Sequence, residues 1–356
     1  MQVLIAGGGT GGHLYPGIAL ARELQRRDQA TAVTFVGTAA GLESRVIPRE
    51  GFVLDVIRVA GLKGKSRMTR LRGLLLLPMA AVDAWRVLSR RRPSVVVGVG
   101  GFSSGPVLAL AALRRCPTLL LEQNALPGIT NRLLAPLVRA AAVNFPEALR
   151  YFPRTGFVAG NPVRAEFFEP LAGAASDGNV RVLIMGGSQG AHAINVAMTQ
   201  AAPALAASGV RLAITHQTGE RDLAAVREAY ASAGLTARVE PFLYEMDREM
   251  KQADVVVARA GATTLSELAA SGRPAILVPL PTAADDHQRR NAEAFARIGG
   301  AVVLEERGLT GERLAAELLT LAQDPARRED MGRQSRTLAR PDAAERIADK
   351  VYALAR

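Results

Sequence analysis

The chain has 356 residues, of which 49% are hydrophobic and 22% are charged. This balance is typical of globular proteins, and the length favours two domains. A single cysteine excludes a disulfide framework or a zinc site built from several cysteines, and the four scattered histidines show no metal-ligand spacing. The net charge of +11 arises in residues 1–160, which carry 21 basic and 8 acidic residues. An anionic partner is therefore expected on the N-terminal side.

Short β-branched runs alternate with longer stretches of helical period along the whole chain. In the first half, the pattern predicts strands at 2–6, 32–36, 53–57, 94–98, 118–122 and 140–144, and helices at 16–27, 42–49, 68–91, 105–115 and 128–138. In the second half, it predicts strands at 180–185, 211–216, 237–241, 254–258, 274–278 and 301–304, and helices at 189–206, 220–233, 262–271, 288–298 and 309–323. Such alternation indicates two α/β domains, each a doubly wound parallel sheet. Ligands of such sheets bind at the carboxyl ends of the strands, so the expected site is a cleft between the domains.

The domain boundary is expected within residues 158–164, ahead of a loop-like stretch at 170–179. We expect an N-terminal domain over 1–160 and a C-terminal domain over 161–340. The start of the chain is interpreted as a first strand and not as a secretory signal, because it has no basic segment and Gly7 soon ends the apolar run.

Two uncharged runs are long enough to span a bilayer, at residues 93–113 and 182–210. Each contains a glycine-rich break, which favours a buried strand followed by a turn and a helix. We therefore expect no transmembrane span in either run.

The first expected strand leads into the loop Gly7-Gly8-Gly9-Thr10-Gly11-Gly12-His13. Glycines between a strand and a helix let backbone N–H groups approach an anion at the helix N-terminus. The loop matches the dinucleotide pattern G-x-G-x-x-G, but the second strand lacks the acid that binds a ribose, and the next acid is Glu43. A nucleotide-dependent oxidoreductase is thus the weaker alternative. A P-loop is excluded because no lysine follows the glycines.

A second glycine loop, Gly186-Gly187-Ser188-Gln189-Gly190, follows the first expected strand of the second half. Its amides and the Ser188 hydroxyl suit a diphosphate, and Arg164 offers a guanidinium that can bind phosphate in a bidentate manner. The alternative is that the glycines of both loops serve only to make tight turns between strand and helix.

Two further polar segments precede or enter helices at the same end of the second domain. Glu267 either caps the first turn of its helix or accepts hydrogen bonds from two sugar hydroxyls. Asp285 or Asp286 is expected as an N-cap, while Gln288 and Asn291 are three residues apart and share a helix face. Adjacent acids in a loop are more often solvated caps, so we assign no metal ligand.

Together these segments resemble the MurG family, the bacterial N-acetylglucosaminyltransferases of peptidoglycan synthesis. The resemblance rests on residues 8–13, 98–106, 122–124, 160–164, 186–191 and 261–267. It implies a GT-B fold, with two Rossmann-like domains, an interdomain cleft, and a last helix at about 341–356 that packs on the N-terminal domain. It further implies inverting transfer of GlcNAc from UDP-GlcNAc to the 4-hydroxyl of MurNAc in undecaprenyl-pyrophosphoryl-MurNAc-pentapeptide. This step turns lipid I into lipid II and serves cell division and cell shape.

The resemblance also implies roles for individual residues. The acceptor junction would be lined by Thr10, Gly11 and Gly12, with Asn124 on the transferred sugar. The donor would be bound by Arg164 and Ser188 at the diphosphate, Leu243 at uracil, Glu267 at the ribose, and Ala262, Thr263 and Gln288 at GlcNAc, with Asn291 beside them. The sequence departs from the family at His287, where glutamine is frequent, and at Phe102, where tyrosine is common.

An inverting displacement requires a base for the acceptor hydroxyl, and His13 is the best candidate because a histidine titrates near neutral pH. The alternative is that His13 orients the loop or binds phosphate. Helix N-terminal amides and Arg164 would stabilise the departing UDP, so we expect no cofactor and no obligatory metal.

Residues 61–92 combine basic side chains with a leucine run and Trp85. This composition suits a peripheral helix on the anionic cytoplasmic leaflet of the plasma membrane, although the leucines could instead face the core. Other cell-wall synthesis proteins are possible partners.

A nucleic-acid-binding protein is the non-enzymatic alternative. The chain has no recognisable nucleic-acid-binding module and only 10 Phe, 5 Tyr and 1 Trp for base stacking, so we expect no nucleic-acid partner.

Overall fold

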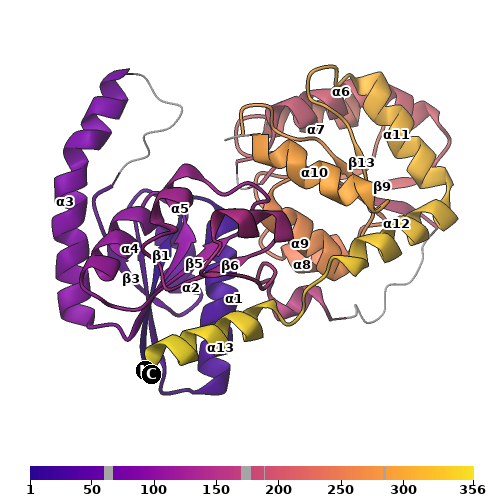
Figure 1. Ribbon diagram of the computed structural model, residues 1–356. Coiled ribbons are helices and arrows are strands. Elements are labelled where there is room, and N and C mark those ends of the chain that lie inside the picture. The colour runs from indigo at the N-terminus through magenta and orange to yellow at the C-terminus, as the bar shows by residue number, and fades with distance from the viewer. Residues whose placement is uncertain (60–66, 170–177, 188, 284–285) are drawn as a thin grey trace. The chain divides into compact units, whose positions relative to one another are not determined.

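The computed structural model describes residues 1–59, 67–169, 178–187, 189–283 and 286–356, and for residues 67–77 the backbone alone. The chain divides into two compact units, each built on a parallel β-sheet (Figure 1). The first unit consists of residues 1–164 together with 340–356, and the second of residues 165–339.

The first unit has a seven-stranded parallel sheet in the order β3-β2-β1-β4-β5-β6-β7. Its strands are β1 Gln2–Gly7, β2 Ala32–Gly37, β3 Val53–Val56, β4 Val95–Gly100, β5 Thr118–Glu122, β6 Ala140–Val143 and β7 Gly156–Val158. Its helices are α1 Gly11–Arg27, α2 Glu43–Arg49, α3 Arg67–Arg91, α4 Ser104–Leu113, α5 Ile129–Leu134 and α13 Ala343–Ala355, with a 3-10 helix at Pro146–Tyr151. The strand order reverses between β1 and β4, which is where open α/β sheets bind ligands.

Both faces of this sheet are covered, which explains why its central strands are continuous apolar runs. Side chains of β1 alternate between two clusters: Ile5 packs with residues of α1 and α13, and Leu4 with residues of α3 and α4. The loops after β1 and β4 therefore emerge from strands that are packed on both faces.

The last helix of the chain, α13, packs against α1 in the first unit (Figure 1). Ile347, Ala348 and Val351 are buried in the same cluster as Leu24 of α1. The Tyr352 hydroxyl donates a hydrogen bond of 3.3 Å to the carbonyl oxygen of Leu24. The C-terminal segment thus completes the hydrophobic core of the N-terminal unit.

The second unit has a six-stranded parallel sheet in the order β10-β9-β8-β11-β12-β13. Its strands are β8 Val180–Met185, β9 Leu212–Gln217, β10 Ala237–Glu240, β11 Val255–Ala258, β12 Ala275–Leu277 and β13 Ala301–Val303. Its helices are α6 His192–Ala207, α7 Leu223–Ser232, α8 Met246–Gln252, α9 Ala262–Ser271, α10 His287–Arg297, α11 Gly311–Gln323 and α12 Pro325–Thr337, with a 3-10 turn at Ala165–Phe167. The order reverses between β8 and β11, so these six strands repeat the order of β1 to β6 in the first unit.

The fold class and every predicted strand are confirmed, and both long uncharged runs form a strand, a turn and a helix. Among the strands and α-helices of the described residues, β7, α8 and α12 were not predicted, and neither were the two 3-10 segments. α12 buries only Met331, Gly332 and Ser335, so its sequence shows no apolar period, while β7 is a three-residue edge strand.

Within the described part of the chain, no helix has the length and apolar character needed to cross a membrane.

Candidate active site

The loop after β1 and the loop after β4 pack against each other at the point where the strand order reverses. The amide of Gly8 donates a hydrogen bond of 3.3 Å to the carbonyl oxygen of Gly100. A Cβ atom at Gly101, whose φ is +83°, would lie 2.3 Å from the carbonyl oxygen of Gly8. Only glycine allows this approach, so the sequence pattern of the two loops encodes their contact.

His13 lies in the first turn of α1, with its ring against the backbone of Gly100. A Cβ atom at position 100 would lie 2.5 Å from Cδ2 of the imidazole. The Nδ1 atom of His13 is 3.1 Å from the Thr10 hydroxyl oxygen, so the loop sets the orientation of the ring. Gly11 and Gly12 begin α1 itself, five residues before the predicted start of that helix.

Glu43, which the sequence indicated only as the acid too late for a dinucleotide site, lies under the glycine loop with 1% of its surface exposed. Its carboxylate accepts hydrogen bonds from the amides of Gly9 and Thr38, both at 2.7 Å, and from the Thr38 hydroxyl at 2.8 Å. These three donors are named the amide cradle below. Sequence reasoning missed this contact because it joins residues 34 positions apart.

Asn124 follows β5 and is held by the carboxylate of Glu122, which is 2% exposed. Glu122 Oε1 accepts from the backbone and side-chain nitrogens of Asn124 at 2.9 and 3.2 Å, and Oε2 accepts from Gly128 N at 3.2 Å and Asn131 Nδ2 at 2.8 Å. Burial raises the pKa of the Glu122 carboxyl, and these hydrogen bonds oppose that rise. One buried carboxylate therefore organises the whole loop after β5.

Arg164 ends the N-terminal segment of the first unit, just before the second unit begins in the sequence. Its guanidinium carbon lies 5.0 Å from the centroid of the Tyr15 ring on α1, an arrangement suited to a cation–π interaction. Tyr15 also borders Gly11, since a Cβ atom there would meet the ring at 3.1 Å. The stacking places this cation beside the first glycine loop.

In the second unit, the glycine loop after β8 is held by the segments that follow β9 and β10. Gln217, 2% exposed, donates from Nε2 to the carbonyl oxygens of Gly187 at 2.8 Å and Pro241 at 3.3 Å. A Cβ atom at Gly190 would lie 1.8 Å from the Thr218 carbonyl oxygen. Ser188 lies outside the described residues. The Gln217 carboxamide thus links this loop to the segment that carries Leu243, itself 8% exposed.

Ala262 and Thr263 form the first turn of α9, and both are largely buried. Glu267, 7% exposed, lies in the second turn, and no acid occupies the first turn. The interpretation of Glu267 as a first-turn cap is therefore wrong, because the helix begins at Ala262 and places its carboxylate one turn further along.

The segment entering α10 also differs from its prediction. Asp286 occupies the N-cap position in a left-handed conformation, with φ of +56°, and its side chain makes no capping hydrogen bond. Its carboxylate instead forms an ion pair with Arg289. The predicted N-cap position is confirmed for Asp286, but its side chain does not cap the helix, and Asp285 lies outside the described residues.

Gln288 and Asn291 share a face of α10 and connect it to two loops at the carboxyl edge of the sheet. Gln288 Oε1 accepts a 3.0 Å hydrogen bond from the amide of Leu280, and Asn291 Nδ2 donates one of 3.3 Å to the carbonyl oxygen of Ala260. Asn291 is fully buried, so its side chain supports the segment that leads into α9.

A buried polar chain behind this site was not predicted. His216 of β9, with no exposed surface, lies 2.8 Å from the Tyr230 hydroxyl through Nδ1 and 3.0 Å from Asn195 Oδ1 through Nε2. Asn195 Nδ2 donates to Thr218 O and Asp222 Oδ2, so Oδ1 accepts and the proton of neutral His216 is on Nε2. Burial lowers the pKa of His216 to about 3, and the Asp222 charge opposes this only partly.

This low pKa of His216 predicts a loss of stability in mild acid. The unfolded histidine binds a proton below about pH 6.5, whereas the folded one stays neutral down to about pH 3. We expect the unfolding free energy to fall by roughly 1.4 kcal/mol per pH unit below pH 6.5 from this residue alone. Urea unfolding between pH 7 and 5 measures the slope. In His216→Gln the unfolding free energy should change less with pH than in wild type, and an equal change in both proteins would contradict the prediction.

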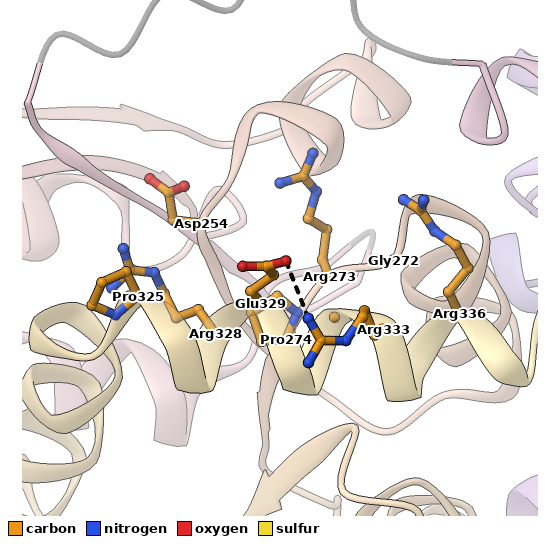
Figure 2. Close-up of a pocket in the computed structure, with 10 residues that line it drawn as sticks. Asp254, Gly272, Arg273, Pro274, Pro325, Arg328, Glu329, Arg333 and Arg336 are labelled. Carbon is orange, nitrogen blue, oxygen red and sulfur yellow. Dashed lines mark hydrogen bonds and ion pairs between the residues drawn. The ribbon is translucent and has the colours of Figure 1, made fainter.

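A cavity of about 430 Å³ in the second unit lies at the opposite, amino-terminal edge of the sheet (Figure 2). Its lining includes four arginines, which suggests an anion site, but each is engaged. Arg273 donates to the Ala253 carbonyl oxygen and Arg328 to those of Leu321 and Ala322. Arg336 donates to Ser271 O, and Arg333 pairs with Glu329, as the dashed line in Figure 2 shows. Three of these arginines thus bind carbonyl oxygens at or next to helix ends, Arg333 pairs within α12, and the cavity is separate from the glycine loops.

In the described residues, no group of three or more His, Cys, Asp or Glu side chains is arranged to hold a metal ion. The loops at the carboxyl edges instead present amides, hydroxyls, carboxamides and single carboxylates. This donor set suits a ligand with hydroxyls and phosphates.

Comparison with known proteins covers the whole chain. Residues 3–143 match the glycosyltransferase family 28 N-terminal domain, and residues 181–347 match its C-terminal domain. The UDP-N-acetylglucosamine–N-acetylmuramyl-(pentapeptide) pyrophosphoryl-undecaprenol N-acetylglucosamine transferase of Anaeromyxobacter dehalogenans (strain 2CP-C) is 49% identical over 100% of this chain and 94% of its own length. The protein of that name from Geobacter sulfurreducens is 45% identical over 100% and 99%. The crystal structure of Acinetobacter baumannii MurG superposes with a TM-score of 0.77 at 31% identity, covering 99% of both chains.

Proposed function

Since the chain belongs to the MurG family of glycosyltransferases and has its GT-B fold, we propose how its two units divide the work of GlcNAc transfer. The protein is an N-acetylglucosaminyltransferase of peptidoglycan synthesis. We assign the acceptor, lipid I, to the first unit and the donor, UDP-GlcNAc, to the second. The observation that carries this proposal is that His13 is presented by a glycine loop at the point where the strand order of the first sheet reverses.

The donor would be held by the loops at the carboxyl edge of the second sheet. Glu267, one turn into α9, accepts hydrogen bonds from the two ribose hydroxyls, and Leu243 lies against uracil. The diphosphate is bound by the glycine loop after β8 with Ser188 and by Arg164, while Ala262, Thr263 and Gln288 contact the sugar. Asn291 acts through the Ala260 carbonyl, because its own side chain is fully buried.

We assign His13 as the general base of the transfer. Its imidazole takes the proton from the MurNAc 4-hydroxyl, the 4-oxygen attacks C1 of GlcNAc, and the bond from C1 to UDP breaks as UDP leaves with the electron pair. Attack opposite to UDP inverts the anomeric centre from α to β. Thr10, Gly11 and Gly12 line the junction of the two substrates, and Asn124 orients the sugar being transferred.

The leaving UDP would be stabilised by the backbone amides at the start of α6 and by Arg164. Amides at a helix N-terminus carry a partial positive charge, and a guanidinium binds phosphate in a bidentate manner. These groups supply the charge that a metal ion supplies in other enzymes, so we propose that no cofactor and no obligatory metal take part.

The test is transfer of labelled GlcNAc from UDP-GlcNAc to a short-chain lipid I analogue by the purified protein, with EDTA present. A β-linked disaccharide product at an undiminished rate supports donor, acceptor, stereochemistry and metal independence together. A rate restored only by added divalent metal contradicts the leaving-group assignment. UDP release with a different acceptor, and none with lipid I, contradicts the acceptor.

We further propose that α3 brings the first unit to the anionic cytoplasmic leaflet, as a peripheral contact. Lys63 and Lys65 of the predicted basic segment lie outside the described residues. In the described part of α3, Met79, Val82 and Trp85 are 37%, 47% and 52% exposed. Leu113 at the end of α4 is 74% exposed, and the neighbouring Arg114 stacks on the Trp85 ring at 4.5 Å. Exposed apolar side chains among arginines suit a lipid surface with acidic headgroups.

We expect Trp85→Glu to reduce binding to vesicles that contain acidic lipid by about tenfold or more, because it removes an apolar anchor and adds a repelled charge. Vesicle co-sedimentation at low and high salt measures this. Val196→Glu is the matched control, since Val196 is 38% exposed on α6 of the other unit. Equal loss in both variants, or undiminished wild-type binding to neutral vesicles in 1 M salt, would argue against the electrostatic contact.

A further inference from the structure

Glycine loops between a strand and a helix direct backbone N–H groups at anions, and here one such N–H group binds the carboxylate of Glu43. The amide of Gly9, which such a loop directs to its ligand, donates to Glu43 Oε2 instead. The other oxygen accepts from both donors of Thr38. Within the described part of the chain, Glu43 forms no ion pair with a basic side chain. The negative charge of the Glu43 carboxylate is therefore stabilised by the hydrogen-bond donors of the amide cradle.

Three glycines are needed for this arrangement. A Cβ atom at Gly8 would lie 2.5 Å from the Glu43 carboxyl carbon, one at Gly37 would lie 2.4 Å from its Cγ, and one at Gly41 would lie 2.2 Å from Oε2. These positions are on three segments: the loop after β1, the end of β2 and the turn before α2. The backbone of these three segments thus closely surrounds one carboxylate, as it would surround a bound anion.

The cradle fixes the loop from one side, and the loop after β4 fixes it from the other. Gly8 lies between the Glu43 carboxylate and Gly101, and its amide is bonded to the Gly100 carbonyl oxygen. The next residues along the loop are Thr10, whose hydroxyl contacts Nδ1 of the imidazole, and His13, whose ring rests on Gly100. Movement of Gly9 would therefore shift the neighbouring Thr10, whose hydroxyl contacts the imidazole of His13.

We infer that Glu43 is a positioning residue for the transfer reaction: its carboxylate is an internal anion that fixes the glycine loop and, through it, the imidazole of His13. This inference rests on the proposed role of His13. It also gives the amide of Gly9 a structural role, since this N–H group donates to Glu43.

The decisive variant is Glu43→Gln. The carboxamide keeps the volume of the side chain but places an NH2 group where one carboxylate oxygen accepted hydrogen bonds, so at least one contact of the amide cradle is lost. We expect kcat for GlcNAc transfer to fall by about 10- to 100-fold, because a displacement near 1 Å of a reacting group has effects of this order. KM for UDP-GlcNAc should stay within about twofold, because the proposed donor residues lie elsewhere.

Glu23→Gln is the matched control. Glu23 is also a largely buried carboxylate of the first unit, bound to Arg26 and Arg27 near the far end of α1, and it takes no part in the site. Compared at temperatures that leave both variants folded, Glu23→Gln should keep the wild-type kcat. Equal kcat in the two variants would overturn the inference.

Two further measurements keep the test decisive. Hydrogen exchange of the peptide containing Gly9 should be faster in Glu43→Gln than in wild type, and unchanged exchange would refute the fixing of the loop whatever reaction the enzyme performs. If Glu43→Gln does not fold, Thr38→Val removes one cradle hydrogen bond at nearly constant volume. We expect that variant to lose about three- to tenfold in kcat, and a wild-type kcat would overturn the inference. Wild-type protein that fails to transfer GlcNAc would instead contradict the proposed function.

Discussion

Replacement of His13 by glutamine is expected to lower kcat for GlcNAc transfer by about 10²- to 10⁴-fold, the usual contribution of a positioned general base. Glutamine retains a polar group near the Thr10 hydroxyl but has no basic nitrogen. KM for UDP-GlcNAc should change little. Initial rates with a lipid I analogue at varied donor concentration measure both constants.

The pH dependence separates a base from a residue that only orients the loop. A base must be neutral, so wild-type kcat should decline at acidic pH, and this decline should be absent in His13→Gln. Thr10→Val, which removes the hydroxyl 3.1 Å from Nδ1, should lower kcat less and keep the acidic decline. Turnover of His13→Gln near the wild-type value, or a retained acidic decline, would remove the base assignment.

Glu122→Gln is expected to destabilise the first unit strongly. All four contacts of this carboxylate come from N–H groups, and a carboxamide accepts through one oxygen and turns its own donors toward the others. A buried group left unsatisfied in this way costs about 2–4 kcal/mol, and the melting temperature should fall by roughly 5–15 °C. Asn124 should also lose its fixed orientation, so kcat should fall at temperatures where the variant is folded.

Glu50→Gln provides the comparison, because Glu50 pairs with Arg22 at the surface, where such a pair contributes about 0–1 kcal/mol. Scanning calorimetry of the two variants beside wild type measures the difference. Equal melting temperatures for Glu122→Gln and Glu50→Gln would show that the loop after β5 does not depend on the buried carboxylate.

The elements and the fold class were predictable because their signals are local. The β1 sequence Gln-Val-Leu-Ile-Ala-Gly is a short apolar run ended by glycine, and such runs recur with helices between them in both halves. α12 escaped prediction because its contacts bury only three residues, so its helical state depends on α9 and α11 beside it. The residues of α12 by themselves do not reveal such contacts with other helices.

Candidate site residues were named from the sequence wherever a turn or a helix start carries them, as with His13 and Thr263. Sequence alone placed these residues at the carboxyl ends of strands, because parallel topology follows from the order of the elements. The residues that hold them in place were missed. Glu43 reaches Gly9 across 34 positions, and Gln217 reaches the second glycine loop across 30.

By itself, then, the sequence determined two doubly wound sheets, their glycine loops and the residues those loops present. These properties depend on hydrophobic period and on glycine conformation, which act within a few residues. Only the tertiary structure decided which buried polar groups satisfy one another. Glu43 in its cradle, Glu122 under Asn124, and His216 between Tyr230 and Asn195 are chosen by strand order and burial, because a buried charge or imidazole must find its partner wherever the fold brings one.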